Sequence, residues 1–258
     1  MLYVRRLKTQ KIIITILRLL LLAGFFVLWE IASEKEWINS FVFSSPVKIW
    51  DCLLVLLKGG ELLHHIRITL METFVSFGLV MGIGVAAAVL LWLCTFLFRV
   101  LEPFLVMLNS LPKTALAPLL IVWLGNSMRT IIVAAVSVAV FGAALSLYTG
   151  FVNMDEDQIR LIYTLGGNKW DVLTKVILPG NIPLILSTMK VNLGLSLVGV
   201  IIGEFLAANE GLGYLIIYGS QVFRLDMVIL SILLLCVIAF VLYGGIQILE
   251  KRLSYNTK

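Results

Sequence analysis

The sequence has 258 residues, of which 60% are hydrophobic and only 14% are charged, and its mean hydropathy is +1.05. A soluble domain of this length is far less apolar, so the composition excludes that class and places the chain in a membrane. The formal net charge of +5 follows from basic residues placed between apolar stretches, so it requires no nucleic acid partner.

Six apolar stretches are long enough to cross a bilayer as helices. A span needs about 20 apolar residues, because the hydrocarbon layer is about 30 Å thick and each helical residue adds about 1.5 Å. None of the stretches alternates apolar and polar residues as the strands of a membrane barrel do. We therefore expect an all-α membrane protein whose six transmembrane helices cover residues 12–32, 73–92, 104–124, 130–151, 182–208 and 227–249.

The first stretch follows four basic residues and resembles a signal peptide at its start. It is too long for the apolar region of a signal peptide and lacks a small-x-small cleavage site, so we expect a membrane anchor. Lysine and arginine are retained on the cytoplasmic side of a membrane. With the N-terminus inside, eleven of these residues fall on inner segments and six on outer segments, which predicts that both termini are cytoplasmic.

Two pairs of glycines in the stretches are spaced for close helix packing. Gly78 and Gly82 form one GxxxG pair, and Gly199 and Gly203 form another. Small residues let helix backbones approach where lipid offers no hydrophobic driving force. The first interpretation of each pair is packing inside one bundle, and the alternative is an interface between subunits.

Ionisable side chains within the stretches are candidates for function, because they are costly in lipid. Lys113 follows Pro112, where we expect a bend in the helix, and Lys190 and Asn192 lie within the fifth stretch. One hypothesis is that the lysines give a translocation path a positive character that suits small anions. The alternative is that they pair with helix carbonyls or reach the inner interface.

Two further ionisable residues lie nearer the ends of their stretches. Arg18 and Glu204 are each within reach of an interface, so we interpret them as anchors whose charged groups extend to water. Glu204 follows Gly203, and for it the alternative is a position on the translocation path. The tentative path residues are therefore Lys113, Lys190, Asn192 and Glu204.

A polar segment, residues 152–180, separates the fourth and fifth stretches, and charge places it in the cytoplasm. We expect Asn153 to cap a short helix, Gly166 and Gly167 to end it, and Asn168 to cap a second helix that ends at Pro179. The predicted apolar face of the second helix consists of Trp170, Leu173, Val176 and Ile177, and Asn181 is the predicted cap of the fifth span. Such a pair of helices suits either anchoring at the interface or docking of a cytoplasmic protein.

No motif for catalysis is found in the sequence. The lysines that precede a threonine, Lys8 and Lys113, lack the glycines of a phosphate-binding loop. The three cysteines have no metal-ligand spacing, and His64 and His65 are adjacent, so on a helix they point about 100° apart. We therefore expect a chain that is not an enzyme and holds no metal or cofactor.

The polar segment resembles the EAA loop of permease subunits of ATP-binding-cassette (ABC) importers. Counting back from Leu178-Pro179 places the glycine of that pattern on Gly166, while the EAA triplet falls on 160–162, which reads Arg-Leu-Ile. Residues 44–70, 111–125 and 203–216 resemble permeases of the nitrate, taurine and aliphatic-sulfonate type, in the same order and spacing.

The resemblance implies a MetI-like type I importer permease fold, with residues 1–258 as one domain in the inner membrane. It implies a second permease copy as a homodimer partner, an extracytoplasmic solute-binding protein, and a cytoplasmic ATPase dimer that binds ATP and Mg²⁺. The EAA-type segment would contact that ATPase. The coupling residues that follow from it are Arg160, Tyr163, Thr164, Leu165, Gly166, Gly167, Lys169, Trp170, Leu178 and Pro179.

The leading functional hypothesis is a permease for a small anionic nutrient, such as nitrate, a sulfonate, taurine or bicarbonate. The alternatives are a permease for a neutral vitamin or pyrimidine precursor, and a membrane scaffold that docks a cytoplasmic protein without transport. An ion-coupled transporter has no support, since no inverted repeat and no midplane carboxylate beside a broken helix is found.

Overall fold

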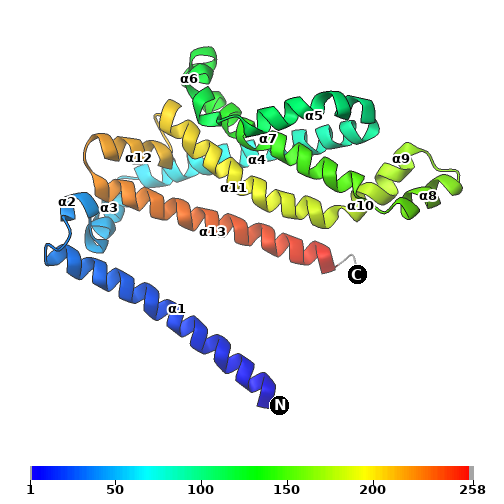
Figure 1. The fold of residues 1–258 in the computed structure, drawn as a ribbon. Helices are drawn as coiled ribbons and strands as arrows, with labels where there is room; N and C mark the ends of the chain where they lie inside the picture. Colours follow the sequence, from blue (N-terminus) through cyan, green and yellow to red (C-terminus); the bar gives the residue numbers. More distant parts are fainter. Residues whose placement is uncertain (1, 256–258) are drawn as a thin grey trace. The chain divides into compact units, whose positions relative to one another are not determined.

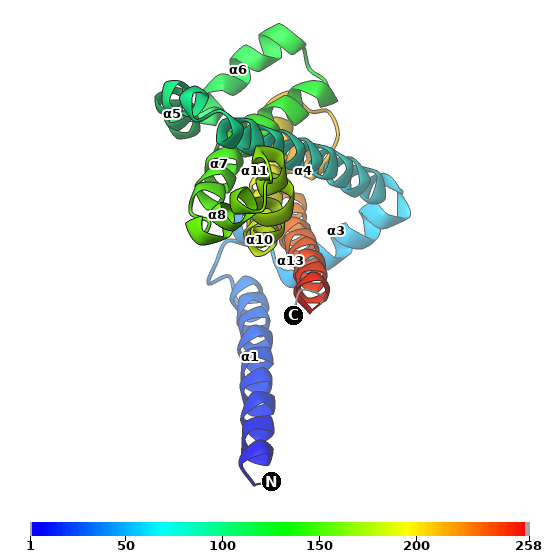
Figure 2. The same ribbon diagram turned by 90° about the vertical axis from the view of Figure 1, so that its right-hand side faces the viewer.

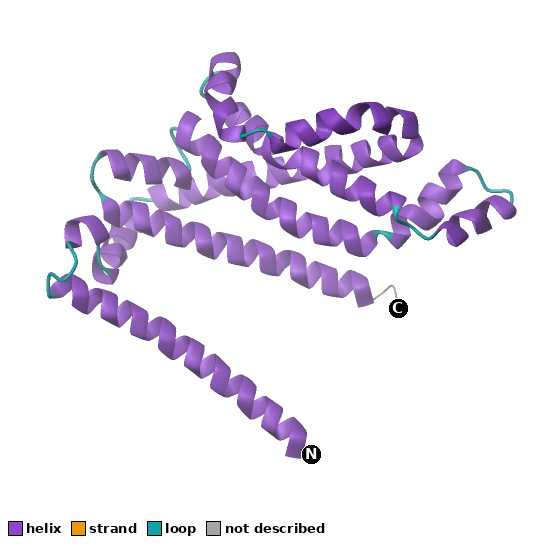
Figure 3. Ribbon diagram, in the orientation of Figure 1, coloured by secondary structure: helices purple, strands orange, loops and turns teal. Residues whose placement is uncertain are grey.

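The computed structural model describes residues 2–255, and these residues form helices and loops with no strand (Figures 1 and 3). The predicted all-α class is confirmed. The chain divides into two compact units, Met1–Leu62 with Ile216–Ile232 and Leu63–Leu215 with Leu233–Lys258. The expected single domain of residues 1–258 stays a prediction, and residues 1 and 256–258 lie outside the described part of the chain.

The first unit is formed by the N-terminal helices and by residues Ile216–Ile232 near the C-terminus. It contains α1 (Leu2–Glu34), α2 (Ser40–Phe43) and α3 (Pro46–Lys58), with parts of α12 (Leu212–Gln221) and α13 (Leu225–Tyr255). Ser45 caps α3 by accepting a hydrogen bond from Lys48 N at 3.3 Å. The Glu30 carboxylate accepts another from Val47 N at 3.1 Å, which ties α1 to the start of α3.

The second unit contains the remaining helices, the other parts of α12 and α13, and all of the predicted coupling and path residues. In chain order, its complete helices are α4 (Glu61–Leu93, whose first two residues belong to the first unit), α5 (Thr95–Ser110), α6 (Lys113–Leu124), α7 (Met128–Val152), α8 (Glu156–Thr164), α9 (Lys169–Val172), the π-helical turn η1 (Leu173–Ile177), α10 (Leu178–Gly180) and α11 (Ile182–Ala207). α7 and α11 run side by side at its centre, and α8 and α9 extend beyond their ends (Figures 1 and 2).

Glycines on α11 allow the close approach of α7. A Cβ atom on Gly199 would lie 2.6 Å from Ala135 Cα, and one on Gly203 would lie 2.9 Å from a methyl carbon of Ile131. Packing inside the bundle is therefore confirmed for this pair. On α4, a Cβ atom on Gly78 or Gly82 would meet nothing within 4 Å, so the same interpretation is wrong for those two glycines. The interface between subunits remains a prediction for them.

Five described helices are long and apolar enough to cross a membrane, and a sixth span exists if one bent pair is counted. The five are Ile16–Glu34, Glu61–Leu93, Met128–Val152, Ile182–Ala207 and Leu225–Ile248. The bent pair, Thr95–Ser110 and Lys113–Leu124, turns by 86°. Leu111 is extended (φ −62°, ψ 134°), the conformation that a following proline imposes, so the bend predicted at Pro112 is confirmed and divides the predicted span 104–124 between α5 and α6.

Candidate functional site

The segment between α7 and α11 begins with a helix whose cap differs from the predicted one. α7 runs to Val152, and Asn153 N donates to Thr149 O at 3.1 Å, so Asn153 ends α7 and does not cap α8. Asp155 takes that role, accepting a hydrogen bond from Asp157 N at 3.0 Å. The sequence pattern predicted a short helix here but placed its cap two residues before the observed one.

Two adjacent glycines form the turn after α8, and each is required for a different reason. Gly166 has φ +83°, the left-handed region that side chains with a Cβ rarely adopt. Gly167 N donates to Ile162 O at 2.9 Å, and a Cβ atom there would lie 2.5 Å from a methyl carbon of Ile162. The turn predicted at this position is confirmed.

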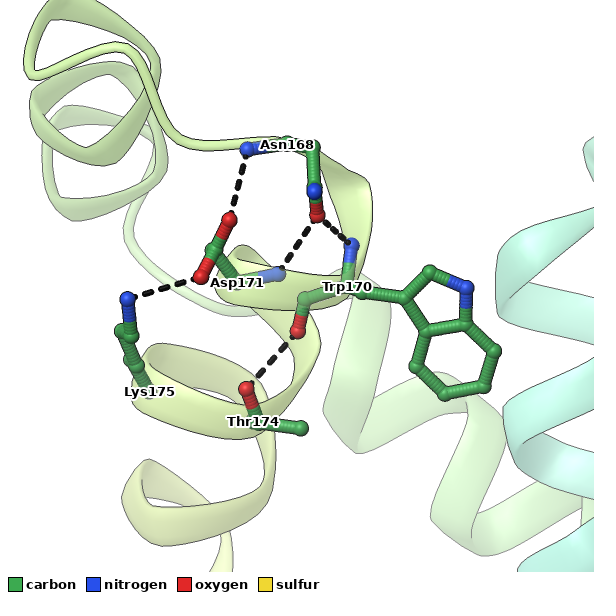
Figure 4. Close-up of polar contacts among 5 residues, drawn as sticks. All are labelled: Asn168, Trp170, Asp171, Thr174 and Lys175. Atoms are coloured by element: carbon green, nitrogen blue, oxygen red, sulfur yellow. Dashed lines mark hydrogen bonds and ion pairs between the residues drawn. The ribbon is translucent and has the colours of Figure 1, made fainter.

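A capping box fixes the start of α9 (Figure 4). Asn168 Oδ1 accepts hydrogen bonds from Trp170 N at 2.9 Å and Asp171 N at 3.0 Å, and Asp171 Oδ2 accepts one from Asn168 N at 2.9 Å. Lys175 Nζ donates to Asp171 Oδ1 at 2.7 Å. The hydrogen bonds from Lys175 and from Asn168 N hold the pKa of Asp171 below its ordinary value. The predicted capping role of Asn168 is confirmed.

The segment is held to the bundle by an apolar core that four helical elements share. Val172, Leu173 and Ile177 are at most 1% exposed and belong to one buried cluster. The other members of that cluster come from α4 and α7 and are Ala88, Leu91, Leu147, Tyr148 and Phe151. Lys169 adds a polar link, since its Nζ donates to Leu93 O at 2.5 Å at the end of α4. The segment is therefore in direct contact with both α4 and α7.

Trp170 lies outside this core, contrary to the predicted apolar face. Its side chain is 60% exposed, while Val172 is fully buried in its place. Trp170 belongs to the first turn of α9, before the residues that enter the core, and its indole extends away from the capping box (Figure 4). Leu173, Val176 and Ile177 are buried as predicted.

The end of the segment also differs from the prediction. Helical geometry continues past Pro179 to Gly180, because Pro179 occupies the first turn of α10, where a missing N–H costs nothing. Asn181 occupies the predicted N-cap position of α11, but its side chain makes no capping hydrogen bond; its amide donates to Ile177 O at 2.9 Å instead. The break between α10 and α11 therefore lies at Asn181.

Several large apolar side chains of the segment are exposed to solvent. Leu165 is 74% exposed, Leu161 57% and Tyr163 49%, in addition to Trp170. Arg160, in the position of the missing glutamate, forms an exposed ion pair with Glu156 at 2.8 Å. Of the remaining predicted coupling residues, Thr164, Gly166, Lys169 and Pro179 are exposed, and Gly167 and Leu178 are partly buried.

The four tentative path residues have separate surroundings. Lys113 begins α6 and donates to Asn109 O, and Lys190 forms an ion pair with Glu250 of α13. Asn192 is buried and donates to Thr188 O at 2.8 Å. The lysines therefore follow the alternative in which their charges are paired. Within the described part of the chain, the hydrogen bonds and ion pairs of Lys113, Lys190 and Asn192 lead to other residues.

Glu204 does not extend to an interface, so the anchor interpretation is wrong. Its carboxylate is 1% exposed and accepts hydrogen bonds from Thr69 Oγ1 at 2.7 Å and from Gly213 N at 2.5 Å. Thr69 Oγ1 in turn accepts one from Leu212 N at 2.8 Å, so α4 and α11 together hold the start of α12. Sequence reasoning missed this network, and also the buried Glu72, because the predicted span began one residue after it.

Long apolar helices, a bent helix pair and a projecting two-helix segment together define a multi-pass membrane protein. Residues 74–255 match the family of binding-protein-dependent transport system inner membrane components, and the chain belongs to that family. This family supplies permeases to ABC importers and is not an enzyme family. The protein is therefore a multi-pass inner membrane component of an ABC importer, a system that also contains an ATPase and a solute-binding protein.

Relatives and solved structures agree with this assignment. An ABC transporter permease protein of Haemophilus influenzae is 30% identical over 94% of this chain and 99% of its own length. The aliphatic sulfonates transport permease SsuC of Bacillus subtilis is 26% identical over 91% and 85%. The formylaminopyrimidine transport permease ThiX of Halalkalibacterium halodurans is 27% identical over 73% and 74%.

The fold is also similar to that of a solved transporter. A chain of the inward-facing MetNI methionine ABC transporter superposes with a TM-score of 0.66 at 21% identity, covering 76% of this chain and 96% of that one. At this identity the likeness concerns the fold alone, and it confirms the MetI-like permease fold.

Proposed function

We propose that this chain forms the translocation path of its importer and that α8 and α9 dock the cytoplasmic ATPase. The observation that carries the proposal is the exposure of Leu165 and Trp170 on a segment that is otherwise tied to the bundle core. Exposed apolar side chains rimmed by polar ones mark interaction sites. Burying both against a partner would remove a large apolar area from water, which favours docking.

The rigidity of the segment suits it to transmit movement. The capping box fixes α9, Gly166 and Gly167 fix the angle between α8 and α9, and Val172, Leu173 and Ile177 enter the core of α4 and α7. Closure of the ATPases around ATP would push on the exposed tip. Because packed cores shift between discrete arrangements, this push would tilt the helices between inward-facing and outward-facing states.

The departure from the EAA pattern changes which side chains make contact with the ATPase. Arg160 and Leu161 stand where the triplet begins, and both are exposed. The first helix therefore offers a basic and an apolar group in place of a glutamate and an alanine. We expect a matching acidic or apolar surface on the ATPase. In this proposal a second copy of the chain completes the path as a homodimer, and a solute-binding protein delivers the substrate.

Two substrate classes are candidates. A small anion, such as a sulfonate, nitrate or bicarbonate, is the prediction from the sequence, and the sulfonate permease among the relatives supports it. A neutral or nitrogen-rich precursor is the second, supported by the formylaminopyrimidine permease and by the pairing of Lys190 with Glu250, which removes a free positive charge.

The docking proposal is tested by replacing Gly166 with valine. A β-branched residue is strained at φ +83°, so the angle between α8 and α9 should change while the spans still insert. Gly60→Val is a matched control, because Gly60 has φ +74° and a Cβ atom at either glycine would meet nothing within 4 Å.

The readout is ATP hydrolysis by the reconstituted importer. We expect Gly166→Val to lose the stimulation by substrate-loaded binding protein and Gly60→Val to keep it. Normal stimulation in a folded Gly166→Val importer would refute the proposed docking segment.

A further inference from the structure

A cavity of about 360 Å³ lies within the first unit and plays no part in the coupling segment. One wall is formed by α2, by α3 and by the loop between them, and the other by the turn between α12 and α13 (Figure 1). Its charged lining consists of Lys48, Asp51, Arg224 and Asp226. Two basic and two acidic side chains therefore line one space.

The cavity lies at the level where two candidate spans of the first unit end. The span in α1 ends at Glu34, and the span in α13 begins at Leu225, which is itself part of the lining. Glu30, four residues before the end of the α1 span, accepts the hydrogen bond from Val47 N that ties α3 to α1. The walls of the cavity are therefore held at the boundary between hydrocarbon and water, which is the level of lipid headgroups.

Two features of the walls are unfavourable for the protein alone. Ser44 lines the cavity and is 2% exposed, and its Oγ has no hydrogen-bond partner among the described residues. Ser44 and Phe223, on opposite walls, both have positive φ, +53° and +57°, although neither is a glycine. Unpaired buried polar groups and strained backbone are retained most often where a ligand is bound. Both features therefore point to a ligand in this cavity.

The charges of the lining are only partly compensated. Arg224 pairs with Asp226 at 3.1 Å, but a guanidinium carries five N–H donors and can bind a further oxygen. Lys48 Nζ donates to Ser40 Oγ at 3.0 Å, a neutral group that does not cancel its charge. Asp51 forms no ion pair with another described residue. The cavity thus suits a ligand with an anionic group for the basic side chains and a cationic group for Asp51.

Exposed apolar side chains border these charged groups. Phe41 and Phe223 are both exposed and stack with their ring centroids 6.5 Å apart. Val55 of the lining is exposed too, as are Trp37 and Trp50 elsewhere in the first unit. Aromatic side chains in this position are typical of the membrane interface. The border suits a ligand whose charged end continues into hydrocarbon chains.

We propose that this cavity binds the headgroup of a phospholipid that carries a phosphate and a protonated primary amine, such as phosphatidylethanolamine. The phosphate accepts hydrogen bonds from Lys48 and Arg224 and from Ser44 Oγ. The amine donates to Asp51, and the acyl chains pass the stacked aromatic pair. The bound lipid joins α2 and α3 to the start of α13. An acidic loop of the solute-binding protein is the other possible occupant, but an occupant without a cationic group leaves Asp51 unpaired.

Lipid binding to the delipidated importer tests the proposal. The permease, purified with its ATPase in detergent, is titrated with short-chain phosphatidylethanolamine, phosphatidylglycerol and phosphatidylcholine, and bound lipid is counted by native mass spectrometry. Phosphatidylethanolamine should bind most tightly, because phosphatidylglycerol has no amine and the quaternary amine of phosphatidylcholine has no N–H donor. Lys48→Gln should weaken this binding about tenfold, the effect of losing one charge-assisted hydrogen bond. Asp51→Asn should abolish the preference for phosphatidylethanolamine over phosphatidylglycerol.

Two matched controls carry the same changes of charge outside the cavity. Lys58→Gln alters an exposed lysine of the same helix, α3, and Glu61→Gln alters an exposed carboxylate of the same unit. Neither residue lines the cavity, so both variants should bind the three lipids as the wild type does.

Ser44→Gly distinguishes a ligand site from a purely structural one. Glycine adopts φ +53° and ψ −164° without strain, so the thermal midpoint of the delipidated variant should not fall. Its affinity for phosphatidylethanolamine should fall, because the hydroxyl is lost. A lowered midpoint with unchanged lipid binding would show that Ser44 serves the fold and would overturn its assignment to the site.

Three further results would overturn the proposal. The first is equal binding of the three lipids by the wild type, and the second is an unchanged headgroup preference in Asp51→Asn. The third is unchanged lipid binding in Lys48→Gln together with a lowered affinity for the solute-binding protein, which would assign the cavity to that protein. None of these results bears on the docking of the ATPase, which Gly166→Val tests separately.

Discussion

Replacing Asn168 by alanine should loosen the first turn of α9 while leaving the bundle intact. The variant removes both hydrogen bonds to Asn168 Oδ1, from Trp170 N at 2.9 Å and from Asp171 N at 3.0 Å. Loss of a capping side chain costs about 1 kcal/mol, which raises the population of the locally opened turn about fivefold. The amides of residues 170–173 should therefore exchange hydrogen about five times faster.

Hydrogen exchange followed by mass spectrometry measures this effect in nanodiscs. Asn168→Asp keeps the acceptor oxygen and should exchange at nearly the wild-type rate. Because Trp170 follows the cap directly, stimulation of ATP hydrolysis should fall in Asn168→Ala and remain in Asn168→Asp. Unchanged exchange in Asn168→Ala, or faster exchange spread equally over α4 and α7, would refute the claim that the cap fixes this turn independently.

Two other predictions concern pH and packing. Asp171 has a lowered pKa, so the stabilisation from its bonds with Lys175 and Asn168 is present at neutral pH and is lost as pH falls through the ordinary aspartate range and the lowered pKa. The protection factor at the start of α9, which divides out the pH dependence of intrinsic exchange, should fall over that acidic range in the wild type and not in Asp171→Asn, which never carries the charge. Gly199→Ala should destabilise the protein by about 1–3 kcal/mol, because its Cβ would lie 2.6 Å from Ala135 Cα. Gly194→Ala on the same helix meets nothing within 4 Å and should not lower the thermal midpoint.

Composition and periodicity were enough to predict the helical class and the position of most spans. Five of the six predicted stretches correspond to single long helices, because an apolar run of that length has few other ways to satisfy its backbone. The capping role of Asn168 was also predictable, since cap residues act on the backbone within three positions. The 86° turn at Leu111 was not, because a proline signals a bend but not its size.

Long-range contacts decide the features that the sequence did not predict. Glu204 and Thr69 are 135 positions apart, and no local pattern indicates their hydrogen bond. The sequence left two interpretations open for Lys113 and Lys190, a positive path or paired charges, because their partners, a backbone carbonyl and Glu250, are not visible in it. Helical periodicity predicted that Trp170 is buried, whereas Val172 is buried and Trp170 is exposed. Burial here depends on which residues reach the core formed with α4 and α7, and the sequence of the segment alone does not show this.

The most direct test of the central claim is a photo-crosslinker placed at Leu165, the most exposed of the apolar side chains named in the coupling segment. A crosslinker at Val122, which is 83% exposed on α6, is the control. In the importer purified with its ATPase, position 165 should crosslink to the ATPase and position 122 should not. Crosslinks from position 165 to lipid alone, with the ATPase present and active, would contradict the docking role of the segment.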